Sequence, residues 1–312
     1  MELRHLRYFA AVADAGNVSR AARRLHLTQP ALSRQIQDLE RDLACRLFDR
    51  LGRRIVLTRD GNELLERTRR LLADADALRE RARALVGGEA GVLRIGAPPQ
   101  FIEAALPEVL TRYASVYPGI EVELIEDGGS ALLRRVQQGE LHLAVGLLRT
   151  GGLQGQPLYP NRVLAVMQRR HRLASRNTLT VTELTENPLL LLGYDFQTRV
   201  LFDEACQAAP FEPSVRLESR SPQSLVALAG AGHGIAIVPS VVRLDASRVA
   251  IAGMLDGARP LGSWSHVVWD LRRYLPTYAQ GFIKVLEDYA KTSYPGHQLG
   301  DLTRAVPRPP TL

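Results

Sequence analysis

Polar side chains near the N-terminus combine the residue types that read the edges of DNA bases. Gln29, Ser33, Arg34 and Gln37 recur at helical spacing, so they share one face of a helix. Arginine and glutamine can each make two hydrogen bonds to a guanine or an adenine, and serine can bond to a base or a phosphate. The apolar residues of the same segment form the opposite stripe: Leu32, Ile36, Leu39 and Leu43. The pattern predicts a helix that packs with one face and presents hydrogen-bonding groups with the other.

Two shorter helices must hold this polar helix in place. Apolar spacing predicts a helix over Leu3–Ala15 and a second over residues 18–25, for which Asn17 is a suitable N-cap. After a short turn, Thr28 can cap the third helix, and Pro30 fits its first turn, where a missing N–H costs little. Two short helices, a tight turn and a polar-faced third helix form the helix-turn-helix pattern.

A small hairpin should follow the third helix. Three arginines surround Gly52, and the segment 55–57 after them is rich in β-branched and aliphatic residues, as expected of a strand. Arginines on such a wing can follow the phosphates or enter the minor groove. The candidate DNA contacts are therefore Asn17, Val18, Ser19, Arg20, Thr28, Gln29, Pro30, Ser33, Arg34, Gln37, Arg50, Arg53 and Arg54.

The charge of the chain is concentrated in the same segment. Residues 1–59 hold twelve arginines against six acidic residues, a net charge of +6, whereas the whole chain of 312 residues carries +7. A basic first segment on a nearly neutral body is the electrostatic footprint of a DNA-binding module.

Residues 59–88 predict a long helix with an apolar seam. Small and apolar residues alternate at spacings of four and three for about three heptads, at Leu64, Thr68, Leu71, Ala75, Leu78, Ala82 and Leu85. Charges of both signs fill the other faces, which favours a helix paired with a second copy of the chain. Packing of this helix on its own body is the alternative. The pair Gly87-Gly88 should end it and act as a hinge.

The remaining two thirds alternate between strand and helix patterns, which predicts an α/β fold with a mostly parallel sheet. The expected strands are 92–96, 120–125, 141–145, 163–167, 189–192, 215–217, 235–238 and 267–269. The expected helices are 103–115, 130–138, 198–208, 222–230 and 277–290. We expect a two-lobed body over residues 89–292 and a disordered, proline-rich tail over 293–312.

The sequence resembles the LysR-type transcriptional regulators. The resemblance rests on AARRLHLTQPALSRQIQDLERDL (residues 21–43) with its following LF-x-R, G-R-R and T-x-x-G motifs, and on YPGIEVEL-x-E and G-x-GIAIVP in the body. It implies a winged helix-turn-helix over residues 1–58, a linker helix for dimerisation, and an effector domain similar to periplasmic binding proteins. It also implies an activator or repressor that binds an imperfectly palindromic promoter site as a homodimer or homotetramer and can meet RNA polymerase.

The same resemblance suggests an effector site at the carboxyl ends of the strands, between the two lobes. The residues carried over are Pro99, Gln100, Gly128, Gly129, Ser130, Phe196, Gln197 and Thr198. Helices that begin near Ser130 and Thr198 would point free N–H groups at the ligand, which favours a small organic anion. Arg149 and Arg199 are either its counter-charges or ordinary surface residues. His142 stands where the family commonly has aspartate; we interpret it as a tolerated surface change.

Other classes of function have less support. The chain has no nucleophile elbow, P-loop, dinucleotide fingerprint or zinc-ligand spacing, so we predict neither an enzyme nor a cofactor. A solute-binding protein would not need the basic segment. A regulator without an effector, or a redox sensor using Cys206, stays open beside the interpretation of Cys45 and Cys206 as small buried residues. The N-terminus lacks a signal-peptide pattern and no apolar run could span a membrane, so we expect a cytoplasmic protein.

Overall fold

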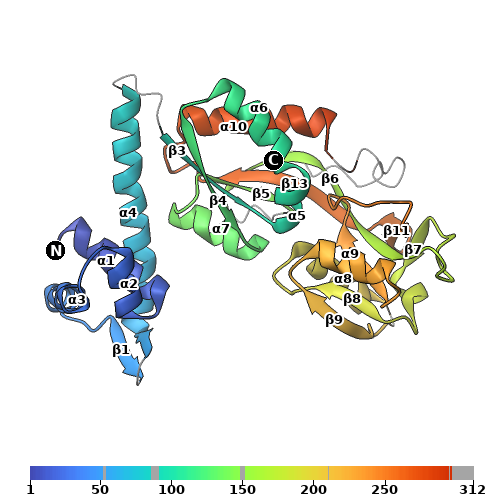
Figure 1. Cartoon of the computed structure of the whole chain (residues 1–312), viewed down its shortest axis with the longest axis horizontal. Coiled ribbons are helices and arrows are strands. Elements are labelled where there is room, and N and C mark those ends of the chain that lie inside the picture. Colours follow the sequence, from blue (N-terminus) through green and yellow to red (C-terminus); the bar gives the residue numbers. More distant parts are fainter. Residues whose placement is uncertain (52–53, 86–90, 148–151, 210, 295, 297–312) are drawn as a thin grey trace. The chain divides into compact units, whose positions relative to one another are not determined.

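The computed structural model describes residues 1–51, 54–85, 91–147, 152–209, 211–294 and 296 of the chain (Figure 1). It forms two compact units: the first comprises Met1–Gly88 together with Gln138–Glu140, and the second comprises the rest of the chain from Glu89 onward. The predicted linker helix therefore clusters with the helix-turn-helix. Among the helices described, none is long and apolar enough to cross a membrane.

The first unit has the predicted helix-turn-helix and wing. Its elements are α1 (Leu3–Ala15), α2 (Val18–Arg24), α3 (Gln29–Leu43), β1 (Phe48–Leu51), β2 (Arg54–Leu57) and α4 (Arg59–Leu85). The two predicted caps are confirmed: Asn17 accepts a hydrogen bond from the backbone N–H of Arg20 (3.0 Å), and Thr28 accepts one from Ala31 (3.4 Å). The core forms around Phe9, whose ring meets Phe48 edge-on at 5.4 Å.

Helix α4 divides the predicted apolar seam between two environments. Near its start, Thr68 of the seam is only 4% exposed and Leu64 is half-buried, while the neighbouring Leu65, which was not part of the predicted seam, is 8% exposed and packs against the helix-turn-helix. Further along, Leu71 and Leu78 are 51% and 72% exposed. The start of α4 thus packs on its own unit, as the alternative for this helix supposed, whereas Leu71 and Leu78 have no apolar cover within that unit. The side chain of Leu85 and the pair Gly87-Gly88 lie outside the described residues.

The first lobe of the second unit surrounds a parallel three-stranded core. Its strands β4 (Ile120–Glu126), β3 (Gly91–Ala97) and β5 (Leu143–Gly146) are parallel, and β13 (Gly262–Trp269) joins β5 in the antiparallel sense. Its helices are α5 (Pro99–Ala104), α6 (Leu106–Val116), α7 (Gly129–Gln138) and α10 (Thr277–Thr292). Apolar residues of these strands and of α5, α6 and α10 form the main core.

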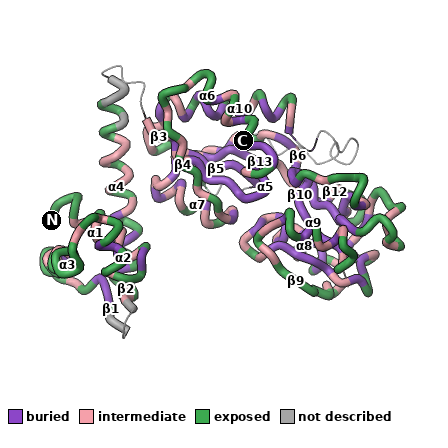
Figure 2. Tube along the Cα trace, in the orientation of Figure 1, coloured by how far each residue is buried: buried purple, intermediate pink, exposed green. Residues whose placement is uncertain are grey.

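The second lobe repeats this arrangement. Strands β10 (Ile235–Pro239), β8 (Leu189–Leu192) and β9 (Val215–Ser219) are parallel. The lobe also contains β7 (Thr178–Thr180), the short 3-10 helix η1 (Val181–Leu184), α8 (Gln197–Ala208), α9 (Pro222–Gly230), β11 (Val249–Asp256) and β12 (Arg259–Pro260). Figure 2 shows buried central strands in both lobes and exposed outer faces on the helices around them.

One long strand joins the lobes. Strand β6 (Gln154–Gln168) pairs with β13 in the first lobe, and then with β10 and β11 in the second. All of these pairings are antiparallel, so the sheet is mixed and the predicted mostly parallel sheet is wrong. Only residues 163–167 of β6 were predicted as a strand. Pro157 and Pro160 cannot donate hydrogen bonds to a neighbouring strand, so their presence argued against a strand in the preceding residues. A register shift in β13 between Ser265 and His266 accommodates the proline-containing stretch.

Two other predictions need correction. The helix expected over 103–115 is two helices, because Pro107 lacks an N–H and its ring would clash with the carbonyl four residues earlier. The disordered tail expected from residue 293 does not begin there: Tyr294 is 5% exposed, and its ring stacks on that of Tyr159 with 4.6 Å between the centroids. Residue 295 and residues 297–312 lie outside the described residues.

Candidate DNA interface and effector site

The predicted recognition surface is the outer face of α3. Leu32, Ile36 and Leu39 are buried in the core of the unit, which fixes the orientation of the helix. Gln29, Pro30, Arg34 and Gln37 are exposed, and Ser33 is half-buried. The side-chain amide of Gln29 donates to the Ser33 hydroxyl at 3.3 Å. The face therefore presents donors and acceptors at helical spacing without being covered by its own unit.

The start of α2 has mixed roles. Ser19 is exposed, whereas Val18 packs partly against the core of the unit. Asn17 caps the helix, and the guanidinium of Arg20 donates to the backbone carbonyl of Ala15. These residues thus first serve to set α2 in place.

The wing is anchored at its base by the T-x-x-G motif. The Thr58 hydroxyl donates to the carbonyl of Arg46 (2.7 Å) and accepts from the N–H of Gly61 (2.8 Å). Glu40 of α3 accepts from the backbone N–H of Leu47 at 2.8 Å. A Cβ at Gly61 would lie 2.1 Å from the Leu47 carbonyl oxygen, so only glycine fits there without displacement. These contacts tie the wing to the recognition helix.

The wing arginines can be followed only in part. The backbones of Arg50 and Arg54 lie in β1 and β2, where Arg50 pairs with Ile55. Their side chains and the whole of Arg53 lie outside the described residues. Their contact with DNA stays a prediction.

The predicted effector residues gather at the carboxyl ends of parallel strands. Pro99 and Gln100 open α5 after β3, residues 128–130 lead into α7 after β4, and residues 196–198 lead into α8 after β8. Gln100 is only 6% exposed, and its Oε1 has no hydrogen-bond partner among the described residues. An unpartnered acceptor buried to this degree carries a desolvation penalty that a bound ligand could relieve.

Three charged residues join the lobes beside these loops. Arg220, which follows β9, donates to Asp195 (2.6 Å) after β8, and also to Asp127 (3.3 Å) after β4 of the other lobe. Its guanidinium lies over the ring of Phe196, 5.6 Å from the centroid. This ion bridge was not predicted from the sequence. The only available signal was that each of the three residues follows a predicted strand.

Both interpretations of Arg199, as a counter-charge for the ligand and as a surface residue, are wrong. It is 3% exposed, so it is not a surface residue. Its Nε lies 2.8 Å from both carboxylate oxygens of Asp203, its Nη1 lies 2.7 Å from Glu218, and its guanidinium stacks on Tyr194 at 4.0 Å. The carboxylates of Asp203 and Glu218 already balance the charge of Arg199, so Arg199 is not available as a counter-charge for a ligand. Arg149 lies outside the described residues.

The predicted role of His142 needs correction. His142 is half-buried and accepts a hydrogen bond from the backbone N–H of Arg94 at 3.0 Å, so its interpretation as a surface change is wrong. Within the described ranges, His, Cys, Asp and Glu form no group that could hold a metal ion.

The cysteine geometry weighs against thiol chemistry at Cys206. Its side chain is 5% exposed in the core of the second lobe, and burial raises the pKa of the thiol to about 12. Burial also raises the pKa of the half-buried Cys45 thiol. Because the thiolate is the reactive form, both shifts lower the reactivity of these cysteines near neutral pH.

Comparison with known proteins covers nearly the whole chain. Residues 3–62 match the family described as "Bacterial regulatory helix-turn-helix protein, lysR family", and residues 87–291 match "LysR substrate binding domain". The uncharacterised transcriptional regulator YybE of Bacillus subtilis is 30% identical, with 90% of this chain and 97% of YybE covered. The transcriptional regulator IlvR of Caulobacter vibrioides is 32% identical, with 92% and 98% covered.

Solved structures have the same fold. The LysR family regulator CbnR, 26% identical, aligns over 93% of this chain and 99% of its own with a TM-score of 0.64. Full-length CbnR in complex with its target DNA is equally similar in fold, at a TM-score of 0.64, 26% identity and coverage of 92% and 99%. A full-length OxyR of Pseudomonas aeruginosa reaches a TM-score of 0.69 at 22% identity over 99% of both chains.

Proposed function

Because the chain belongs to the LysR family of DNA-binding transcriptional regulators, we propose that α3 and the wing read its DNA site and that a small organic anion bound between the lobes controls its activity. The exposed polar face of α3 is the observation that carries the DNA part of the proposal. The DNA complex of CbnR supports it, since that relative binds its target DNA with the same fold.

DNA reading is tested by gel shift on the DNA flanking the gene of this protein, with a salt titration. We expect a sequence-selective complex whose affinity falls steeply with salt, because phosphate contacts release counterions. Arg34→Ala should reduce discrimination between sequences by about 1–3 kcal/mol, whereas Arg53→Ala should weaken binding to all sequences alike. The exposed Arg67, which is ion-paired with Glu63 on α4 and lies outside the recognition helix and the wing, gives a control in Arg67→Ala. Failure to form any selective complex would refute this part.

Two copies of the chain should pair through α4. Leu71 and Leu78 are exposed, although burying such side chains would each contribute about 1.5–3 kcal/mol. A two-fold pair of α3 helices would then read the two halves of an imperfect palindrome. Sedimentation equilibrium of Leu78→Glu should show a shift toward monomer relative to the exposed-charge control Arg79→Glu. Unchanged assembly of Leu78→Glu would refute the pairing.

The effector part is supported by two features of the second unit. The loops before α7 and α8 lie at the carboxyl ends of strands, where the free N–H groups of a helix favour an anion. The buried Gln100, whose Oε1 has no hydrogen-bond partner in the described part of the chain, lies at the start of the neighbouring α5. A thermal-shift screen of small organic acids tests the proposal, because a ligand of the native state raises the melting temperature. Gln100→Leu should weaken any hit, and a hit unaffected by this change would argue for another site.

A further inference from the structure

The contact between the lobes at their effector-facing loops is ionic and asymmetric. Asp195 and Arg220 belong to the second lobe, and their 2.6 Å ion pair holds the Arg220 side chain over the ring of Phe196. Asp127 belongs to the first lobe, and its 3.3 Å contact with Arg220 is the one that crosses between the lobes. Asp195 therefore positions the guanidinium, and Asp127 is the partner that can leave.

The backbone beside Asp127 shows how closely the lobes meet. An added Cβ at Gly128 would lie 2.6 Å from the Asp195 carboxylate and 2.9 Å from its backbone oxygen. Gly128 itself is buried, and its N–H donates to the Asp127 carboxylate at 2.9 Å. The ion pair thus forms where the loops of the two lobes are in direct contact.

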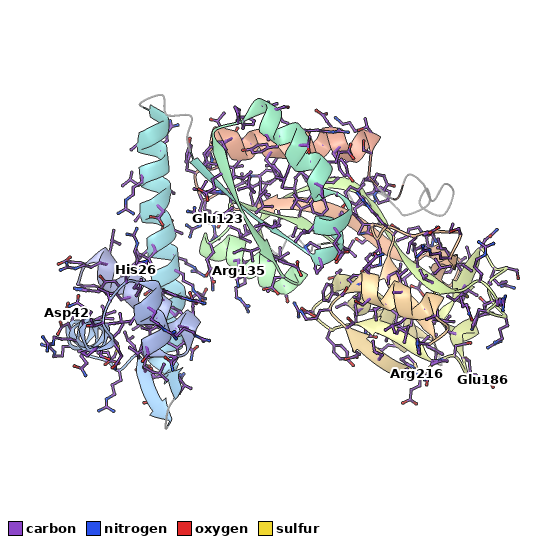
Figure 3. The ribbon with its side chains drawn as sticks, viewed as in Figure 1. His26, Asp42, Glu123, Arg135, Glu186 and Arg216 are labelled. Carbon is purple, nitrogen blue, oxygen red and sulfur yellow. The ribbon has the colours of Figure 1, made fainter. Side chains whose placement is uncertain are left out.

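Asp127 places a carboxylate in surroundings suited to an anionic ligand. The carboxylate lies just before the N-terminus of α7, in contact with Arg220 and 3.8 Å from the guanidinium of Arg135, which is labelled on α7 in Figure 3. Arg220 is 63% exposed, so a ligand can reach it from solvent. Exchanging one carboxylate for another on the same guanidinium leaves the local charge balanced, and an ion pair with an exposed guanidinium contributes little stability.

We propose that Arg220 recognises the carboxylate of the effector and that Asp127 is a built-in competitor which the effector displaces. Displacement breaks the ionic contact between the lobes, so binding favours an arrangement in which their loops separate at this edge. The energy available is the difference in ligand affinity between the two arrangements. This inference rests on the proposed effector site, for which it supplies the residue that binds the anion.

Acetate is the test probe, because it carries the same carboxylate group as the Asp127 side chain and has the same size. The full chain is titrated by thermal shift with sodium acetate against sodium chloride at equal ionic strength. Asp127→Asn keeps the shape and an acceptor for the Gly128 N–H but removes the competing charge. We expect it to bind acetate at least threefold more tightly than the unmodified chain, because the competing carboxylate charge is gone. Asp127→Asn combined with Arg220→Gln should lose that gain.

The matched control is Glu123→Gln. Glu123, labelled on β4 in Figure 3, forms a 3.0 Å ion pair with Arg94 within the first lobe, so its loss removes a charge without touching the bridge. It should respond to acetate as the unmodified chain does. The proposal is overturned if Asp127→Asn gains no affinity, or if the double variant retains the gain.

Amide hydrogen exchange tests the link to lobe separation. The segment 193–198 of the second lobe should exchange at least threefold faster in Asp127→Asn than in Glu123→Gln, and equal rates would overturn the coupling. The outcome is independent of the gel shift and of the acid screen. A chain that binds no DNA but shows the acetate pattern contradicts only the DNA-reading proposal, and an acid that binds equally well without Arg220 contradicts only this inference.

Discussion

Gly61 lies in the first turn of α4, directly after the wing, and replacing it with alanine should destabilise the DNA-binding unit. The new Cβ would lie 2.1 Å from the carbonyl oxygen of Leu47 and 3.1 Å from the Thr58 hydroxyl. The oxygen belongs to the backbone and accepts a hydrogen bond from the Thr58 N–H at 3.0 Å, so it cannot move without disturbing the anchor of the wing.

The magnitude follows from two effects. Overpacking of this kind costs about 1–3 kcal/mol, and weakening the Thr58 cap of α4 costs about 0.5–2 kcal/mol. We therefore expect Gly61→Ala to lower the free energy of unfolding by about 2–4 kcal/mol, which corresponds to a fall of roughly 10–25 °C in the melting temperature of a unit of this size.

Differential scanning calorimetry of the full chain measures the effect. The transition of the first unit should fall while that of the second is retained, and sequence-selective DNA binding should be lost at the lowered melting temperature. Gly230→Ala is the matched control, since its Cβ would meet only a side-chain carbon of Val249, at 3.2 Å. A Gly61→Ala chain that melts like the unmodified chain would show that the wing is not anchored as described.

Three further predictions concern the second unit. Arg199→Met should lower the free energy of unfolding, measured by urea unfolding, by about 2–3 kcal/mol. This is less than the usual cost of breaking a buried ion pair, because the carboxylates of Asp203 and Glu218 reach solvent. Cys206 should resist iodoacetamide at pH 8 in the folded chain and react after denaturation, because burial raises its pKa to about 12; rapid alkylation of the native chain would contradict its burial. Burial lowers the pKa of His266, so the neutral form is favoured in the folded state and stability should fall as the pH drops below the unfolded value of about 6.5. His266→Gln should reduce that decrease in urea unfolding between pH 7 and pH 5, and an unchanged pH profile would assign it to other groups.

Local patterns predicted the first unit almost completely. The caps Asn17 and Thr28 and the buried stripe of α3 follow from residue types a few positions apart, so they can be deduced without knowledge of the fold. The bounds of α1 and α3 follow for the same reason. The strands of the two parallel sets of the second unit were also predicted, since each is a short apolar run or a short run of alternating apolar and polar residues between helices.

Contacts between residues distant in the sequence could not be predicted in the same way. Strand β6 was largely missed because its pairing with β13 and β10 outweighs the two prolines within it. The ordered position of Tyr294 depends on stacking with the ring of Tyr159. The role of Arg199, on helix α8, depends on the carboxylate of Glu218 on strand β9.

The sequence by itself determined that this chain carries a helix-turn-helix with a polar recognition face, a long helix and an α/β body, because periodicity, capping and charge are local properties. Only the tertiary structure decided which charges meet. Asp127, Asp195 and Arg220 follow three different strands, and the pairing of those strands in the two lobes brings their side chains into one ion bridge. An ion pair depends on the distance between side chains in the fold, and this distance has no counterpart in the spacing of residues along the chain.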